Sequence, residues 1–75
     1  SRDLAKPLVQ RAMARFETDR RAALLDLDRA IELVEDDAAL RLLRGNLREE
    51  LIDRRGALAD YDQAIALEPR NARAH

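Results

Sequence analysis

Acidic residues in close pairs are the side chains that come nearest to forming a chemical site in this sequence. They are Asp26 and Asp28, Asp36 and Asp37, Glu49 and Glu50, and Asp60 and Asp62. The spacing of Asp60 and Asp62 suits a calcium-binding loop, but Ile65 stands where such a loop requires glycine. Adjacent or alternate residues on a helix do not face each other, so each pair is better explained as a solvated helix surface or a helix cap. We therefore expect no metal site and no cofactor.

The residues that nucleophilic catalysis needs are nearly absent. There is no cysteine, the only serine is Ser1, the only threonine is Thr18, and the only histidine is His75 at the end of the sequence. A nucleophile therefore cannot be paired with a base. We expect that this segment contains no catalytic residues and is not an enzyme.

Charge and composition narrow the class of partner. Fourteen Lys and Arg against fifteen Asp and Glu give a net charge of -1, so no overall field attracts nucleic acid or an anionic membrane. The only aromatic residues are Phe16 and Tyr61, too few to stack bases. Arginine pairs at 20–21 and 54–55 could form a small basic ridge, although solvation and pairing with nearby acids explain them more simply. Apolar runs do not exceed four residues, so we expect a soluble segment that binds neither nucleic acid nor membrane.

An internal repeat organises the chain. The stretch from Asp19 to Leu33 matches the stretch from Asp53 to Leu67 at ten of fifteen positions, far above chance. In both copies apolar residues recur at steps of three and four, which is the pattern of an amphipathic helix. The stripe is Ala23, Leu24, Leu27, Ala30 and Ile31 in one copy and Ala57, Leu58, Tyr61, Ala64 and Ile65 in the other. The aspartates Asp26, Asp28, Asp60 and Asp62 fall largely outside it.

These patterns predict an all-α fold of four helices in two antiparallel pairs, over residues 7–17, 20–34, 38–52 and 54–68. Suitable N-cap aspartates precede the last three helices, at Asp19, at Asp36 or Asp37, and at Asp53. Pro7 is tolerated only in a first turn, so the first helix should begin near it. Pro69 cannot donate the next helical hydrogen bond, so the last helix should end before it.

The second half of the chain resembles the tetratricopeptide repeat, a helix-turn-helix unit of about 34 residues, which is also the distance from Asp19 to Asp53. The spacing of Gly45, Ala57, Tyr61, Ala64 and Pro69 reproduces the family's small, small, aromatic, small, proline pattern without a gap. The small residues let two helices cross closely. The resemblance implies two repeats in a short right-handed α-solenoid, a degenerate one over residues 1–37 and a good one over 38–71. Residues 72–75 would begin a third repeat, with Asn71 as its N-cap.

Two registers are open for the first helix. In the constant register, which keeps the offset between Asp19 and Asp53, Arg11 occupies the close-contact position, where an arginine fits poorly. In the shifted register the first helix moves by one residue, so that "RA" at 11–12 aligns with "RG" at 44–45, and Arg15 aligns with Arg48. We favour the shifted register.

The resemblance implies an interaction scaffold whose first helices line a concave groove for a peptide or a partner protein. The groove would include Ala39, Leu42, Asn46, Glu49 and Glu50, with some of Leu8, Ala12, Arg15 and Phe16. Asn46 is the best candidate, because a side-chain amide can bond a peptide backbone through both its donor and its acceptor. Phe16 and Met13 are more often packing residues. Leu8 and Leu42 stand where some family members use basic residues to grip a C-terminal carboxylate, so we expect micromolar or weaker binding of such peptides.

A structural or oligomerisation module of a larger protein is the alternative to a peptide-binding scaffold. Stacked repeats usually bury a continuous core only when at least three are present, so two repeats are expected to be a portion of something longer. An exposed end face that includes Leu58 and Ile65 would then pack on a further repeat or on another copy of the chain.

Overall fold

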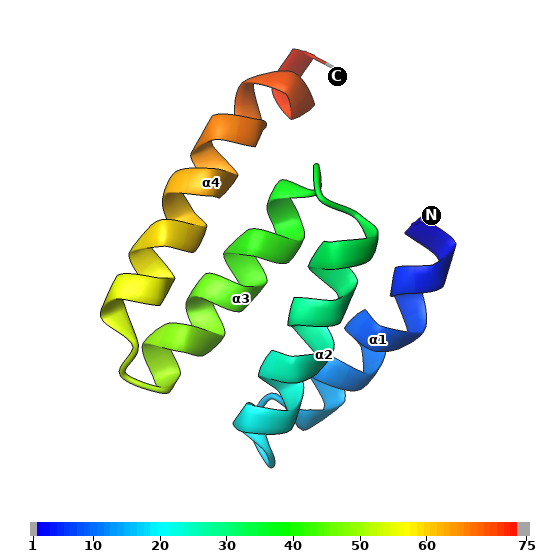
Figure 1. Ribbon diagram of the computed structural model, residues 1–75, viewed down its shortest axis with the longest axis vertical. Coiled ribbons are helices and arrows are strands. Elements are labelled where there is room, and N and C mark those ends of the chain that lie inside the picture. The colour runs from blue at the N-terminus through cyan, green and yellow to red at the C-terminus, as the bar shows by residue number, and fades with distance from the viewer. Residues whose placement is uncertain (1, 74–75) are drawn as a thin grey trace.

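The computed structural model describes the backbone of residues 2–73 and the side chains of residues 3–67. Over that range the chain forms four helices and no strand, which confirms the all-α prediction. The helices are α1 (Arg2–Arg15), α2 (Arg20–Leu33), α3 (Ala38–Glu50) and α4 (Arg54–Arg73). Successive helices run antiparallel and are joined by turns at 16–19, 34–37 and 51–53 (Figure 1). Each helix packs against its neighbour in sequence, so α1 and α2 form one hairpin and α3 and α4 form another.

Aspartates cap the last three helices, as the sequence predicts. The Asp19 carboxylate accepts a hydrogen bond from the Ala22 backbone N–H at 3.2 Å, and the Asp37 carboxylate accepts one from Ala39 at 3.0 Å. Asp53 caps α4 in the same way. Each cap satisfies an amide of the first turn that has no partner within the helix, and so fixes where the helix starts.

Both prolines lie inside helices, so the predictions that they mark helix ends are wrong. Helix α1 begins at Arg2 and passes through Pro7, and α4 passes through Pro69 and ends at Arg73. A proline removes one hydrogen bond of the ladder, and a helix can continue past it when the turns on either side are kept. Residues 72–73 therefore continue α4. The predicted start of a third repeat at 74–75 and the side chain of Asn71 lie outside the described residues.

The core consists of two apolar clusters, both formed by α1, α2 and α3. The first contains Ala5, Ala30, Ile31, Val34 and Leu40, with Leu8 and Val9 packed against it. The second contains Ala12, Ala23, Leu27 and Leu47, with Phe16, Leu24, Leu43 and Leu51 packed against it. The buried apolar residues of α4 are the small ones, Ala57 and Ala64. The larger apolar side chains Leu58 and Ile65 remain 61% exposed, as expected for an end face.

Close packing between α3 and α4 depends on Gly45. A Cβ atom built on this residue would lie 2.7 Å from Cε1 and 2.9 Å from Cδ1 of the Tyr61 ring, closer than real contacts. In the first hairpin Leu27 is the counterpart of Tyr61, and the fully buried Ala12 is the counterpart of Gly45 when the shifted register is used. The small residue of α1 is therefore Ala12, in agreement with that register.

Candidate functional site

Each hairpin encloses one aspartate between two arginines of its first helix. In the second hairpin the Asp60 side chain is only 2% exposed. It accepts hydrogen bonds from Arg44 Nε at 2.9 Å, from Arg44 Nη2 at 2.7 Å and from Arg48 Nη1 at 3.0 Å. Its oxygens are thus occupied by guanidinium groups, which leaves them poorly placed to bind a metal.

The first hairpin repeats this arrangement around Asp26. Arg11 donates to its carboxylate from Nε at 3.1 Å and from Nη2 at 2.7 Å, and Arg15 Nη1 lies 3.5 Å away. The hydrogen bonds from Arg11 lower the pKa of Asp26, against the opposing effect of burial, and the charge of Arg15 lowers it further. The same pairing raises the pKa of Arg11. The pair is therefore ionised at neutral pH.

The burial of Asp26 and Asp60 corrects the expectation that the aspartates of α2 and α4 lie on solvated surfaces. Asp62, which is exposed, fits that expectation, whereas Asp28 is half-buried and pairs with Arg44.

The sequence nevertheless holds a signal for the buried pairs. Asp26 and Asp60 are counterparts in the repeat. The arginines that bind them are also counterparts, Arg11 with Arg44 and Arg15 with Arg48, in the shifted register. Oppositely charged residues thus recur at equivalent positions on the two helices of each hairpin. This recurrence indicates ion pairs between the helices rather than side chains in solvent.

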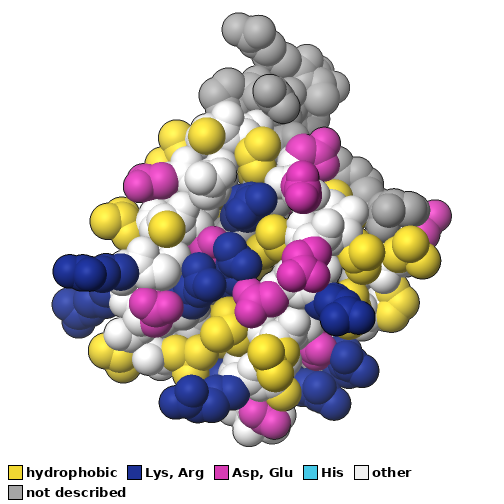
Figure 2. Space-filling model, viewed as in Figure 1, with side chains coloured by type: hydrophobic (Ala, Val, Ile, Leu, Met, Phe, Trp, Pro, Cys, Tyr) yellow, Lys and Arg dark blue, Asp and Glu magenta, His cyan; other side chains and the backbone are white. Residues whose placement is uncertain are grey.

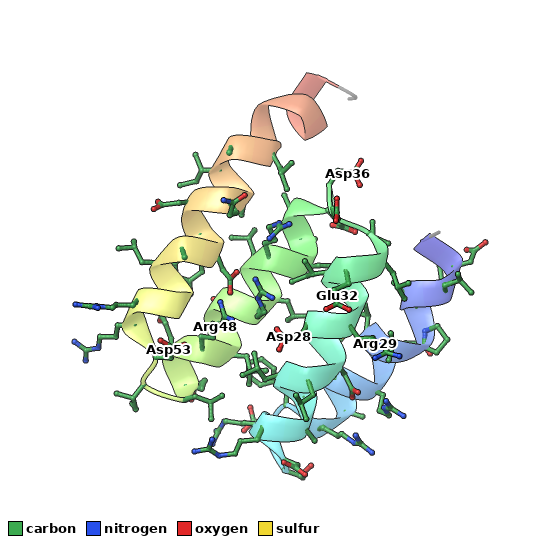
Figure 3. The ribbon with its side chains drawn as sticks, in the orientation of Figure 1. Asp28, Arg29, Glu32, Asp36, Arg48 and Asp53 are labelled. Carbon is green, nitrogen blue, oxygen red and sulfur yellow. The ribbon has the colours of Figure 1, made fainter. Side chains whose placement is uncertain are left out.

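Two further ion pairs join the hairpins. Arg44 Nη1 lies 2.9 Å from Asp28 Oδ1, and Asp28 projects from α2 toward α3 (Figure 3). Arg20 Nη2 of α2 lies 3.7 Å from Glu50 Oε2 of α3. Arg44 therefore holds α3 against both α2 and α4, and neighbours of both helices raise its pKa, chiefly the hydrogen-bonded Asp60.

Some of the residues expected to contact a partner, chiefly those of α3, lie on one face shared by α1 and α3, which we call the inner face. It consists of Lys6, Val9 and Met13 of α1, of Phe16 directly after α1, and of Ala39, Leu42, Asn46 and Glu49 of α3. Within each helix these residues follow steps of three, four and three, so they share one face. The two sets correspond residue by residue in the shifted register. Leu42 and Met13 are 43% and 60% exposed, and Asn46 and Glu49 are also exposed.

Part of the predicted partner surface is placed differently. Ala12 is fully buried in the second cluster and offers no surface to a partner. Leu8 packs against the first cluster, and Arg15 is committed to Asp26. The predicted groove used the constant register for the first helix, and the shifted register puts Val9 and Met13 where Leu8 and Ala12 were expected.

A shallow pocket opens between α1 and the start of α3, with a volume of about 490 Å³. Its lining is Ala5, Lys6, Val9, Gln10, Val34, Asp37, Ala39 and Leu40. The apolar members include two buried residues of the first cluster, Ala5 and Val34, while Lys6 and Asp37 add one charge of each sign. The pocket can therefore hold a small apolar group beside a polar backbone.

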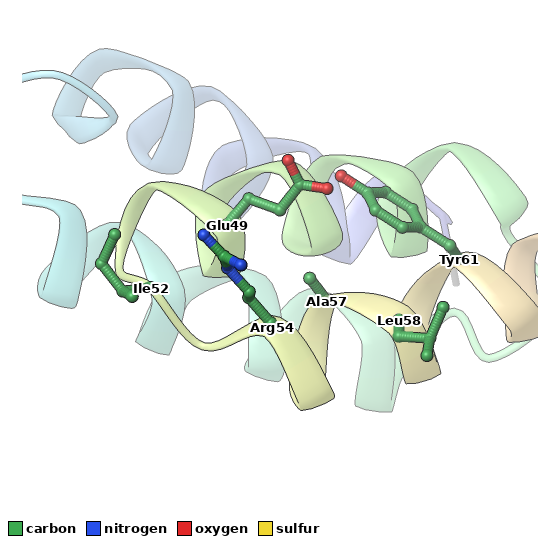
Figure 4. Close-up of a pocket in the computed structure, with 6 residues that line it drawn as sticks. All are labelled: Glu49, Ile52, Arg54, Ala57, Leu58 and Tyr61. Carbon is green, nitrogen blue, oxygen red and sulfur yellow. The ribbon is translucent and has the colours of Figure 1, made fainter.

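Asn46 is already engaged through its side-chain oxygen. The Tyr61 hydroxyl donates a hydrogen bond to Asn46 Oδ1 at 2.8 Å, so Asn46 offers a peptide chiefly its amide N–H groups. Burial and the nearby Glu49 carboxylate, which points toward the hydroxyl in Figure 4, raise the pKa of Tyr61. The tyrosine thus stays a protonated donor and holds Asn46 in one orientation.

The rest of the described surface carries mixed charge. Figure 2 shows acidic and basic side chains interleaved over the middle of one face, with hydrophobic side chains nearer its edges. Among the described residues, no group of three His, Cys, Asp or Glu could hold a metal ion. In the same part of the chain, none of the helices has the length and apolar character needed to cross a membrane. Comparison with protein-family models, with curated proteins and with solved structures finds no match to this chain.

Proposed function

We propose that this chain is a tetratricopeptide-like interaction segment that binds a peptide or a partner protein on the inner face and carries out no catalysis. Its two hairpins would be successive repeats of a right-handed α-solenoid, in which first helices line the concave side. Support comes from the internal repeat and from the fit of Gly45 against Tyr61, a small residue against an aromatic one.

The observation that carries this proposal is the pocket between α1 and α3. It is lined by Lys6 and Val9 of α1 and by Ala39 of α3, which are inner-face residues. An extended peptide could place a small apolar side chain in the pocket and run along α3 to the amide of Asn46. Main-chain hydrogen bonds would supply affinity and the pocket would select the side chain.

A random peptide library displayed on phage and selected on the intact chain tests this function. Selected peptides are then measured against the double variant Leu42→Ala with Asn46→Ala, which should bind at least about tenfold more weakly, since contacts at an interface centre are worth about 1 kcal/mol or more each. Leu25→Ala is the matched control, because Leu25 is 70% exposed on α2 and lies outside the inner face. Equal binding by the double variant and the control would refute the inner-face proposal.

A structural or oligomerisation module is the second candidate, favoured by the exposure of Leu58 and Ile65 on α4. Sedimentation of the chain over a wide concentration range separates the two functions. A monomer that still binds selected peptides supports the scaffold, and concentration-dependent assembly without peptide binding supports the module.

A further inference from the structure

The outer face of α4 repeats the surface that α2 presents to α3. We call it the end face, and it consists of Arg54, Leu58, Asp62 and Ile65. Their counterparts in the repeat, on α2, are Arg20, Leu24, Asp28 and Ile31. Ile31 is 6% exposed where α3 covers it, whereas Ile65 is 61% exposed. Similar side chains are therefore covered in one hairpin and open in the other.

A hollow that is filled beside α2 stands open beside α4. It has a volume of about 480 Å³ and is lined by Glu49, Ile52, Arg54, Ala57, Leu58 and Tyr61 (Figure 4). In the first hairpin the counterparts of Ala57, Leu58 and Tyr61 are Ala23, Leu24 and Leu27. These share a cluster with Leu43 and Leu47 of α3 and with its C-cap residue Leu51. The packing of α3 on α2 therefore indicates which kind of segment would fill this hollow, namely a helix with leucines at steps of four.

The charges of the end face follow the same template. On α2, Asp28 pairs with Arg44 of α3 at 2.9 Å, and Arg20 pairs with Glu50 of α3 at 3.7 Å. Asp62 and Arg54 occupy the equivalent places on α4, and within the part of the chain whose side chains the structure describes they form no ion pair. A docked helix could pair an arginine with Asp62 and a carboxylate with Arg54, if these two groups were spaced along it as Arg44 and Glu50 are along α3.

We propose that the end face binds an amphipathic helix of a partner protein whose pattern copies that of α3. Its leucines fill the hollow beside Ala57 and Leu58, its arginine pairs with Asp62, and its carboxylate pairs with Arg54. This binding mode is a helix packed side by side on α4, and Glu49, which lines the hollow, is the one inner-face residue beside it.

A second copy of the chain, stacked end to end, fits this face poorly. The helix that would dock is α1. Arg11 of α1 stands at the position of Arg44, and Glu17, in the turn after α1, stands at the position of Glu50. The α3 residues Leu40, Leu43 and Leu47, however, correspond to Pro7, Gln10 and Ala14 of α1. Without leucines at these three positions α1 would leave the hollow largely empty, and so the proposed occupant is a helix other than α1 of a second copy.

Peptides taken from the chain itself provide the probes. The first covers residues 37–52 and is held helical by a covalent link between positions 41 and 45, since Gly45 faces α4 rather than α2 in the intact chain. The isotope-labelled intact chain is titrated with it and followed by NMR. We expect saturable shifts of the backbone amides of Leu58, Asp62 and Ile65, while those of Leu42 and Met13 stay in place.

Two controls separate the apolar from the ionic part of the recognition. An equally linked peptide of residues 4–19 keeps the arginine and the glutamate but has no leucine at the positions of Leu40, Leu43 and Leu47, and it should bind at least about tenfold more weakly. The Asp62→Arg chain should bind the first peptide about fivefold more weakly and should recover affinity when the peptide carries Arg44→Glu.

Three outcomes would overturn the proposal. They are the absence of end-face shifts at millimolar peptide, equal binding of the two peptides, and self-association of the chain alone that Ile65→Asp abolishes, which would assign the face to a second copy. Shifts confined to the inner face would instead support the proposed function and reject this inference.

Discussion

Arg44 and Asp60 form a buried two-point pair, in which Nε and Nη2 of the guanidinium lie 2.9 and 2.7 Å from the two carboxylate oxygens. The aspartate is on α4 and the arginine is on α3, so the pair fixes both the distance and the rotation between the two helices. Removing one member of a buried pair leaves the other charged and desolvated, which is why such losses are large.

Asp60→Asn should therefore destabilise the chain by about 3 kcal/mol, a large share of what so small a core provides. Urea unfolding followed by circular dichroism measures the effect. Asp62→Asn is the matched control, because Asp62 lies two residues away on the exposed side of α4 and should change stability by less than about 0.5 kcal/mol. Similar losses in both variants would contradict the structural role of the pair.

Gly45→Ala should destabilise the chain although alanine is the better helix former. The new methyl group would collide with the Tyr61 ring, at about 1–3 kcal/mol, and this exceeds the gain in helix propensity of about 1 kcal/mol. Thermal melts of the variant should thus show a lower midpoint than those of the parent chain.

The variant Tyr61→Leu tests whether the clash with the tyrosine ring causes this loss of stability. Leucine suits the position, since the first hairpin combines Ala12 with Leu27 at the equivalent positions. In the Tyr61→Leu background, Gly45→Ala should be neutral or stabilising, because the ring that it met is gone. The same loss in both backgrounds would show that the clash with Tyr61 is not the reason.

The parts of the fold that depend on local pattern follow from the sequence. The stripe of α2 and the aspartate caps are set by residues near in the chain, so the number and order of the helices and the starting points of the last three are predictable. The prediction that the last helix ends before Pro69 is wrong. The hydrogen bond that proline lacks is a local cost, whereas the continuation of a helix depends on the turns on either side.

The candidate surfaces depend on contacts between helices, and these are harder to predict. Asp60 looks solvated when helix α4 is considered alone, and only the crossing with α3 brings Arg44 and Arg48 to it. Ala12 was placed on the partner surface because a shift of one residue rotates a helix by about 100°. Internal repeats partly overcome this limit, because one hairpin provides the template for interpreting the other.

Ile52→Gly should stabilise the chain by about 1 kcal/mol. Ile52 has a φ angle of 63°, a left-handed conformation that is strained for a β-branched residue and is usual for glycine. It follows the end of α3, where its N–H bonds to Glu49 O and the N–H of Asp53 bonds to Arg48 O. These two bonds define a Schellman ending, which glycine favours.

Urea unfolding of this variant measures the gain. Ile52→Ala is the control, because it removes the same exposed side chain without relieving the backbone. An equal gain from alanine would attribute the effect to the loss of an apolar side chain that is 75% exposed, and not to backbone strain.

Acid should weaken the first hairpin through Asp26, whose pKa the hydrogen bonds from Arg11 lower below its ordinary value of 3.8. A carboxylate with a lowered pKa in the folded chain contributes stability that is fully present above about pH 5 and is lost as the pH falls through the folded pKa.

The melting temperature of the parent chain should therefore exceed that of Asp26→Asn clearly at pH 6. The difference should shrink steadily below pH 4, since protonation gives the parent chain a neutral group like that of the variant. At pH 6, Asp62→Asn should stay close to the parent chain, because Asp62 is exposed. A constant gap between the parent chain and Asp26→Asn from pH 6 to pH 2 would mean that the ionised pair with Arg11 does not stabilise the hairpin.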